Sequence, residues 1–175
     1  MVTLGEGEPL GRKALASNLG LGEGATRTVL KKLSTAGYLQ TNASGCGLTP
    51  AGRRAYQSLR RTLTSPVDIQ GSELSMGRFQ AALAVRGKSR RVKSGIEQRD
   101  SAIKEGALGA TTYVISGGKF TIPGGSGDCE KDFPGKIWAT LRTLSPRNGD
   151  VLILCGSDET SNARVGAIAA ALTLL

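Results

Sequence analysis

The chain lacks several residues that common protein chemistries require. It has no histidine, three cysteines among 175 residues, and 4% aromatic residues. The absence of histidine removes the commonest general base and half of the ligand set of Cys/His zinc fingers. Cys46, Cys129 and Cys155 are odd in number and far apart, which argues against a disulfide scaffold. We therefore expect no metal, no cofactor and no histidine-based catalysis.

Long apolar runs and catalytic patterns are missing too. No stretch of about 18 apolar residues and no signal-peptide pattern occurs, so the sequence predicts a soluble, cytoplasmic protein without a membrane partner. No nucleophile–base pair or carboxylate dyad stands out, and we predict no catalytic residues. An enzymatic activity consequently has little support from the sequence.

Basic residues, by contrast, are abundant and give the chain a formal net charge of +9. Up to Thr64, nine Lys and Arg residues accompany three acids, whereas from Ser65 onward fourteen accompany eleven. The larger excess per residue therefore lies in the N-terminal part of the chain. Binding to nucleic-acid phosphates by counterion release needs such a local excess of cations.

Residues 10–51 show the order helix, glycine turn, basic helix, hairpin and helix. Helices are predicted at 10–18 and 24–35, separated by a turn at 20–22 in which glycine can adopt a positive φ. Apolar residues at helical spacing predict the buried stripe of the second helix, namely Ala25, Val29, Leu30 and Leu33. This order is that of a winged helix-turn-helix, which lays its second helix into the major groove of DNA.

The opposite face of the second helix is polar and, after Glu23, free of acids. Arginine can bind a guanine edge, threonine a base edge or a thymine methyl, and lysine a phosphate. We predict that Arg27 reads a base while Lys31 and Lys32 hold phosphates. The alternative is an ordinary solvated surface, which the neighbouring turn and hairpin make the weaker interpretation. The candidate DNA-binding residues of this helix are Thr26, Arg27, Thr28, Lys31 and Lys32.

A hairpin is predicted over residues 38–48, with an uncharged tip at Ser44 that makes a weak contact with phosphate or with the minor groove. Thr49, followed by proline, has the residue type of a helix N-cap. The helix that it opens is strongly basic. Its Arg53 and Arg54 either contact DNA phosphates or keep the helix soluble, and the sequence favours neither alternative.

The sequence from Glu6 to Leu59 resembles the winged-helix domains of bacterial and archaeal transcriptional regulators. The stretch GRKALASNLGLGEGATRTVLKKLSTAGYL is particularly similar to the N-terminal half of an uncharacterised archaeal family, which pairs such a domain with an α/β domain of unknown function. The resemblance implies DNA binding through Thr26, Arg27, Thr28 and Lys31, and a wing at Ser44 and Gly45.

Residues 1–8 hold only the tail of the helix with which a winged helix usually begins. We expect one of two explanations for this shortening. Either the native start lies upstream of Met1, or another element or a dimer partner covers the core face that the missing helix would cover.

A break at Ser65-Pro66 separates predicted domains at residues 1–64 and 66–175, and beyond it strand and helix patterns alternate. Strands are predicted at 79–85, 111–115, 120–122 and 151–155, and helices at 96–108, 134–144 and 160–175. Ile96, Ile103 and Ala107 are predicted to face inward. The predicted fold class is therefore α+β, with a winged helix-turn-helix followed by an α/β sandwich.

The candidate ligand site of the sandwich follows the apolar strand at 151–155. The point where a strand of an α/β sheet leads into a helix commonly binds ligands, and helix N-termini favour anions. The acids found there either accept hydrogen bonds from a ligand or simply cap the helix. The candidate residues are Gly156, Ser157, Asp158, Glu159 and Thr160, with Arg99 reaching from another helix.

These patterns predict a transcriptional regulator that binds double-stranded DNA, senses a small anionic effector and forms a homodimer. The apolar final segment VGAIAAALTLL needs cover, which either a dimer partner or its own domain supplies. The alternative is a small-molecule-binding protein or an enzyme whose winged helix mediates protein contacts, a use that the same fold permits.

Overall fold

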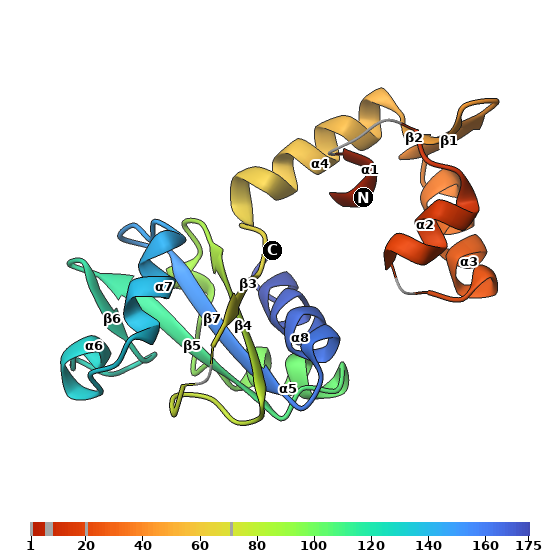
Figure 1. Cartoon of the computed structure of the whole chain (residues 1–175). Coiled ribbons are helices and arrows are strands. Elements are labelled where there is room, and N and C mark those ends of the chain that lie inside the picture. The colour runs from red at the N-terminus through yellow and green to blue at the C-terminus, as the bar shows by residue number, and fades with distance from the viewer. Residues whose placement is uncertain (1, 6–8, 20, 71) are drawn as a thin grey trace. The chain divides into compact units, whose positions relative to one another are not determined.

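The computed structural model describes residues 2–5, 9–19, 21–70 and 72–175. It divides into two compact units, Met1–Arg61 and Thr62–Leu175 (Figure 1). Parts of the predicted helix tail at 1–8 and of the predicted turn at 20–22 lie outside the described residues. None of the helices in the described ranges has the length and apolar character that a membrane crossing needs.

The described part of the first unit contains three helices, a two-stranded antiparallel hairpin and a fourth helix (Figure 1). In chain order these are α1 (Val2–Gly5), α2 (Arg12–Leu19), α3 (Glu23–Thr35), β1 (Leu39–Asn42), β2 (Gly45–Leu48) and α4 (Pro50–Thr62). Leu39 pairs with Leu48 and Asn42 with Gly45, which confirms the predicted hairpin. The tip is glycine-dependent, because Gly45 has a φ of 123°.

A small apolar core holds the first unit together, formed by Leu4, Leu15, Leu30, Leu39, Cys46 and Leu48. Leu4 of α1 is 6% exposed, so this short helix contributes a side chain to the core. Leu10 and Cys46 exchange two backbone hydrogen bonds of 3.1 and 2.9 Å, which tie the segment before α2 to the hairpin. Leu10, Leu33 and Tyr56 pack against this core and are partly buried.

The junction between the hairpin and α4 is fixed by Thr49. Its Oγ1 accepts a hydrogen bond from the backbone N–H of Gly52 at 3.0 Å and donates one to the carbonyl of Gly37 at 2.6 Å. Gly52 is required here, since a Cβ on it would lie 2.0 Å from the carbonyl oxygen of Tyr38. The predicted N-cap is therefore confirmed, and it also connects α4 to the end of α3.

Within residues 62–70 and 72–175, the second unit contains a five-stranded antiparallel sheet with the order β3-β4-β7-β5-β6. Its strands are β3 (Val67–Ile69), β4 (Phe79–Val85), β5 (Gly109–Ser116), β6 (Lys119–Thr121) and β7 (Val151–Ser157). The four predicted strands are confirmed with small shifts at their ends. The edge strand β3 was not predicted, because three residues are too few for a periodic pattern to show.

Helices cover both faces of this sheet (Figure 1). Apart from the 3-10 turn η1 (Ser89–Arg91), the helices of the second unit are α5 (Ile96–Lys104), α6 (Cys129–Asp132), α7 (Ile137–Thr143) and α8 (Thr160–Leu172). Leu83 and Ile153 face α5 and α8, whereas Tyr113 and Leu152 face Trp138 of α7. The α+β class is thereby confirmed.

The predicted inward face of this helix is wrong at Ile96 and Ile103, whereas Ala107, which follows α5, is buried as predicted. Ile96 and Ile103 are 51% and 45% exposed, and the buried residues of the helix are Gln98 and Ala102. Gln98 Nε2 donates a 2.6 Å hydrogen bond to Thr173 Oγ1, so a polar pair joins α5 to the end of α8. The hydrogen-bonded amide of Gln98 and the small side chain of Ala102 allow the two helices to pack closely. The spacing of the apolar residues in the sequence did not indicate this contact.

We predict that Thr49→Ala lowers the free energy of unfolding by about 1–2 kcal/mol, because it removes the N-cap of α4 and the bond to Gly37. Urea unfolding of the full chain, followed by circular dichroism, measures the loss. Ser34→Ala, on the exposed surface of α3, is the matched control and is expected to change little. Equal effects of the two changes would contradict the role given to Thr49.

Candidate functional site

The buried side of α3 differs from the predicted one. Thr26 and Leu30 are 2% and 9% exposed, whereas Val29 is 42% exposed and Ala25 also lies on the surface. Residues 26, 30 and 33 share one face of a helix, so the core side of α3 is centred between Thr26 and Leu30. The predicted stripe is confirmed at Leu30 and Leu33. It is wrong at Ala25 and Val29, because the remaining core position is occupied by Thr26.

The predicted place of Thr26 on the outward face of α3 is therefore wrong, because this residue is buried. Its Oγ1 has no hydrogen-bond partner among the residues that the structure describes. A buried hydroxyl without a partner costs about 1–3 kcal/mol relative to a satisfied one.

The outward ridge of α3 consists of Thr28, Lys31 and Lys32, all exposed. Thr28 lies two positions from both buried residues and therefore points to the opposite side of the helix. Its Oγ1 donates a 3.0 Å hydrogen bond to the carbonyl of Gly24, which leaves the oxygen lone pairs as acceptors. No salt bridge of either lysine occurs within the described ranges. This ridge can donate and accept hydrogen bonds and carries two positive charges.

The other predicted DNA contacts also lie on the surface of the first unit. Ser44 is exposed at the hairpin tip, where its backbone N–H donates to Asn42 Oδ1 at 3.0 Å and shapes the turn. Arg53 and Arg54 are exposed on the first turn of α4. Among the described residues, no hydrogen bond or ion pair joins these side chains to α3, so each remains a separate candidate.

Arg27 lies to one side of the outward ridge of α3. With Thr26, Glu23, Arg12 and Lys13 it lines a small cavity of 110 Å³ between α2 and α3. Sequence analysis did not select Arg12 and Lys13, although both stand in the first turn of a helix without an acid there. That unusual placement of cations was the signal by which they could have been found.

In the second unit, the predicted ligand site after β7 is closed by the chain itself. A Cβ on Gly156 would lie 1.7 Å from the carbonyl oxygen of Met76, so the turn at 75–77 covers the end of the strand. Ser157 is 2% exposed, and its Oγ donates to the carbonyl of Gly106 at 3.2 Å and accepts from the N–H of Glu159 at 3.3 Å. The sheet is antiparallel, so the rule for the carboxyl ends of parallel strands does not apply.

The remaining predicted ligand residues are scattered on the surface. Asp158, Glu159 and Thr160 are exposed where α8 begins. Arg99 pairs with its neighbour Asp100 at 3.0 Å and lines a different cavity, of 270 Å³, beside Thr111 and Ile122. The structure therefore places Arg99 at a site other than the one around Ser157.

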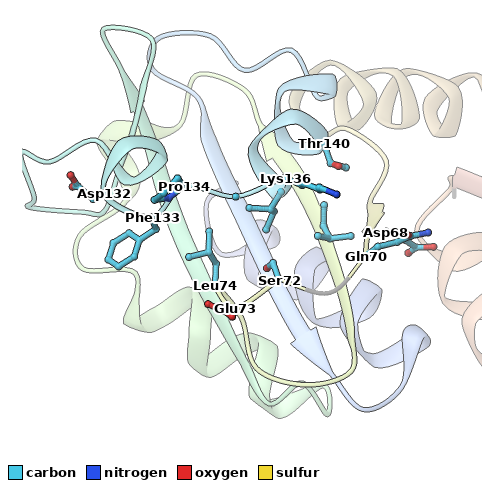
Figure 2. A pocket seen from close by; sticks show the side chains of 13 residues that line it. Asp68, Gln70, Ser72, Glu73, Leu74, Asp132, Phe133, Pro134, Lys136 and Thr140 are labelled. Carbon is cyan, nitrogen blue, oxygen red and sulfur yellow. The ribbon is translucent and has the colours of Figure 1, made fainter.

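A larger cavity of 1050 Å³ opens on the second unit between β3 and the start of α7 (Figure 2). Figure 2 shows Phe133 and Pro134 on one side of it and Asp68 and Gln70 on the other. Its lining residues are Asp68, Ile69, Gln70, Ser72, Glu73, Leu74, Asp132, Phe133, Pro134, Gly135, Lys136, Ile137 and Thr140. Sequence analysis missed this cavity because it joins two irregular segments that are distant in the chain.

The electrostatics of this cavity disfavour a small anion. Three carboxylates and a single ammonium group line it. Arg164 Nε donates a 2.7 Å hydrogen bond to Asp68, and this bond holds the pKa of the Asp68 carboxyl below its usual value. Asp68 is therefore ionised at neutral pH and compensated by Arg164, while Glu73, Asp132 and Lys136 also line the cavity. A neutral or cationic ligand fits this lining better than the predicted anionic effector.

We predict that Thr26→Val raises the free energy of unfolding by about 1 kcal/mol, because it replaces a buried hydroxyl without a partner by a methyl group of similar size. Thr28→Val is the matched control, and its exposed position predicts a change within about 0.5 kcal/mol. Urea unfolding of both variants measures the difference. A loss of stability in Thr26→Val would show that the hydroxyl has a partner in solution.

Comparison with known proteins supports the resemblance to an uncharacterised archaeal family. The chain is similar to the solved structure of hypothetical protein PH0730 from Pyrococcus horikoshii OT3, with 28% identity, a TM-score of 0.70, and coverage of 95% of this chain and 85% of that one. The comparison with curated proteins gives no match. Residues 3–54 match the model of the PH0730-like N-terminal domain, and residues 76–174 match that of a domain of unknown function, DUF4443. Because the latter match spans more than half of the chain, the protein belongs to the DUF4443 family.

Proposed function

We propose that this protein is a DNA-binding transcriptional regulator, with a winged helix-turn-helix in its first unit and a second unit that mediates self-association and effector sensing. The observation that carries the proposal is the exposed ridge of Thr28, Lys31 and Lys32 on α3. It lies opposite the buried side of the helix and is followed by a hairpin and a capped helix. DNA binding, the wing and the homodimer are all parts of this proposal.

The dimensions of α3 suit the major groove. A helix of 13 residues is about 20 Å long, and the groove is about 12 Å wide, enough to admit an α-helix. The buried side of α3 holds it against the core of the first unit, which leaves the ridge free to approach a duplex. Ser44 at the hairpin tip, with Arg53 and Arg54 on α4, then supplies contacts to the sugar-phosphate backbone.

The burial of Thr26 changes the division of roles along α3. We assign base recognition to Thr28 and Lys31, near the centre of the ridge, and phosphate binding to Lys32 at its margin. Threonine can accept from a base edge or contact a thymine methyl, and lysine can donate to guanine. A lysine on phosphate adds affinity that is independent of sequence.

We predict that the full chain binds duplex DNA with an affinity that falls linearly with the logarithm of salt concentration. Lys32→Ala should weaken all duplexes nearly equally and flatten the salt slope by about 1. Thr28→Ala should cost about 1–3 kcal/mol on the preferred site and relax discrimination at one base pair. The preferred site is obtained by selection from a random duplex library, and fluorescence anisotropy gives the affinities.

Lys119→Ala, on the second unit, is the control for the loss of one positive charge. The absence of binding to any duplex at low salt would reject DNA binding altogether. Equal losses from Lys32→Ala and Thr28→Ala on every sequence would reject the assignment of roles and leave DNA binding intact.

An exposed apolar stripe on α8 supports self-association of the second unit. Val165, Ile168 and Leu172 are 45%, 39% and 51% exposed and lie on one helix face. Contiguous exposed apolar surface marks sites of protein contact. A second copy of this chain is the occupant that the proposed function favours, because a two-fold dimer presents two recognition helices about 34 Å apart to successive major grooves.

We predict that the wild-type chain is dimeric at tens of micromolar and that Ile168→Asp makes it monomeric, because a charge would be buried in the interface. Size-exclusion chromatography with light scattering over a concentration series measures the mass. Met76→Asp, at a residue that is 63% exposed elsewhere on the second unit, is the matched control and should remain dimeric. A monomeric wild-type chain, or a dimeric Ile168→Asp variant, would contradict this interface.

The alternative function, a small-molecule-binding protein whose first unit contacts other proteins, is favoured by one observation. The 1050 Å³ cavity has room for a ligand of ordinary size and is lined by both apolar and charged side chains. An effector site in a regulator has the same features. Duplex binding therefore separates the two functions, because only the regulator requires it.

A further inference from the structure

The small cavity between α2 and α3 brings together three cations and one acid. Arg12, Lys13 and Arg27 line it together with one acid, Glu23. Within the described residues, no salt bridge or side-chain hydrogen bond involves any of these three cations. Arg86, Arg142 and Arg164 of the second unit, by contrast, each pair with a carboxylate.

The position of Arg12 and Lys13 on their helix makes this excess of charge more unusual. Both lie in the first turn of α2, an eight-residue helix with no acid in that turn. The free N–H groups of a helix N-terminus carry partial positive charge, so cations there are destabilising and anions stabilising. A cation at a helix N-terminus is unfavourable for folding. A residue type that is unfavourable for local structure is typical of a functional site.

A third feature of the cavity is the hydroxyl of Thr26. This side chain lines the cavity, is 2% exposed, and has no acceptor or donor for its Oγ1 among the described residues. An oxyanion in the cavity, or a water molecule that accompanies it, would supply the missing partner. The cavity volume of 110 Å³ is several times the volume of about 30 Å³ that a water molecule takes up in the liquid.

We propose that Arg12, Lys13 and Arg27 bind a backbone phosphate group of duplex DNA at the N-terminus of α2, an inference that rests on the proposed DNA binding. Two arginines and a lysine supply the charge-assisted hydrogen bonds that phosphate accepts, and the helix terminus adds its own N–H groups. Arg27 then holds phosphate and does not read a base, while base recognition belongs to Thr28 and Lys31. The phosphate contact sets the register of α3 in the groove.

The test is the double charge reversal Arg12→Glu/Lys13→Glu in the full chain. It places acids where the helix N-terminus favours them, so the melting temperature should stay equal to that of the wild type or rise. Duplex affinity should fall at least tenfold at 100 mM salt, and the salt slope should flatten by about 1 for each phosphate contact that is lost. Fluorescence anisotropy on a random-sequence duplex, over a series of salt concentrations, measures both quantities.

Lys119→Glu/Lys131→Glu, on the second unit, is the matched control because it changes the net charge by the same amount. Its salt slope should equal that of the wild type. The exchange Arg12→Lys/Lys13→Arg keeps both charges and should retain the wild-type slope. Together these variants separate a phosphate site from a general effect of charge.

A variant that melts no lower than the wild type and binds duplex with a flattened slope supports the phosphate site. If the wild type binds duplex and Arg12→Glu/Lys13→Glu has an unchanged slope, the phosphate site is rejected while the proposed function stands. A melting temperature that falls by several degrees on charge reversal would show a structural role for the pair and would also reject it. If the wild type binds no duplex at low salt, the proposed function fails, and this site fails with it.

Discussion

The second unit depends on one strand that is hydrogen-bonded along both edges and buried on both faces. β7 pairs with β4 over its whole length and with β5 from Val151 to Gly156. Such a strand has no contact with water, so its side chains must be apolar or satisfied internally. Cys155 meets this condition, since its thiol donates to the carbonyl of Gly109 and burial raises the pKa of that thiol to about 11. Alternate side chains of β7 pack against α7 on one face of the sheet and against α5 and α8 on the other. The 1050 Å³ cavity lies beside α7, at the edge of the sheet that β3 forms.

In the first unit, the backbone groups at the hairpin junction are hydrogen-bonded, whereas several side chains of α2 and α3 lie in unfavourable surroundings. Thr49 satisfies two backbone groups at the junction of hairpin and helix, and the hairpin is regular. Along α2 and α3, however, Arg12 and Lys13 oppose the helix dipole. Thr26 buries a hydroxyl that has no hydrogen-bond partner among the residues that the structure describes. Natural proteins concentrate such departures at functional sites and compensate for them elsewhere. The proposed DNA interface is therefore the part of this unit where local stability and function conflict.

Sequence reasoning succeeded where structure depends on a few adjacent residues. The β1–β2 hairpin follows from its glycine-containing tip, the start of α4 from the Thr49 hydroxyl before proline, and β4 from a run of apolar residues. In each case the hydrogen-bonding groups or backbone preferences that decide the structure lie within a few positions of one another. The exposed polar residues of α3 could be identified in the same way, because helical spacing alone separates Thr28 and Lys31 from Leu30.

The sequence by itself determined the kinds of element, their order and the basic character of α3, whereas only the tertiary structure decided which side chains meet. Thr26 took the core position that Ala25 and Val29 were predicted to fill, because the packing partner of α3 selects its buried face. The turn at Met76 closed the end of β7, and the 1050 Å³ cavity arose between segments that are distant in the chain. Contacts between distant segments contribute more free energy than local hydrophobic spacing. One sequence read along its length does not specify which segments will be neighbours in space.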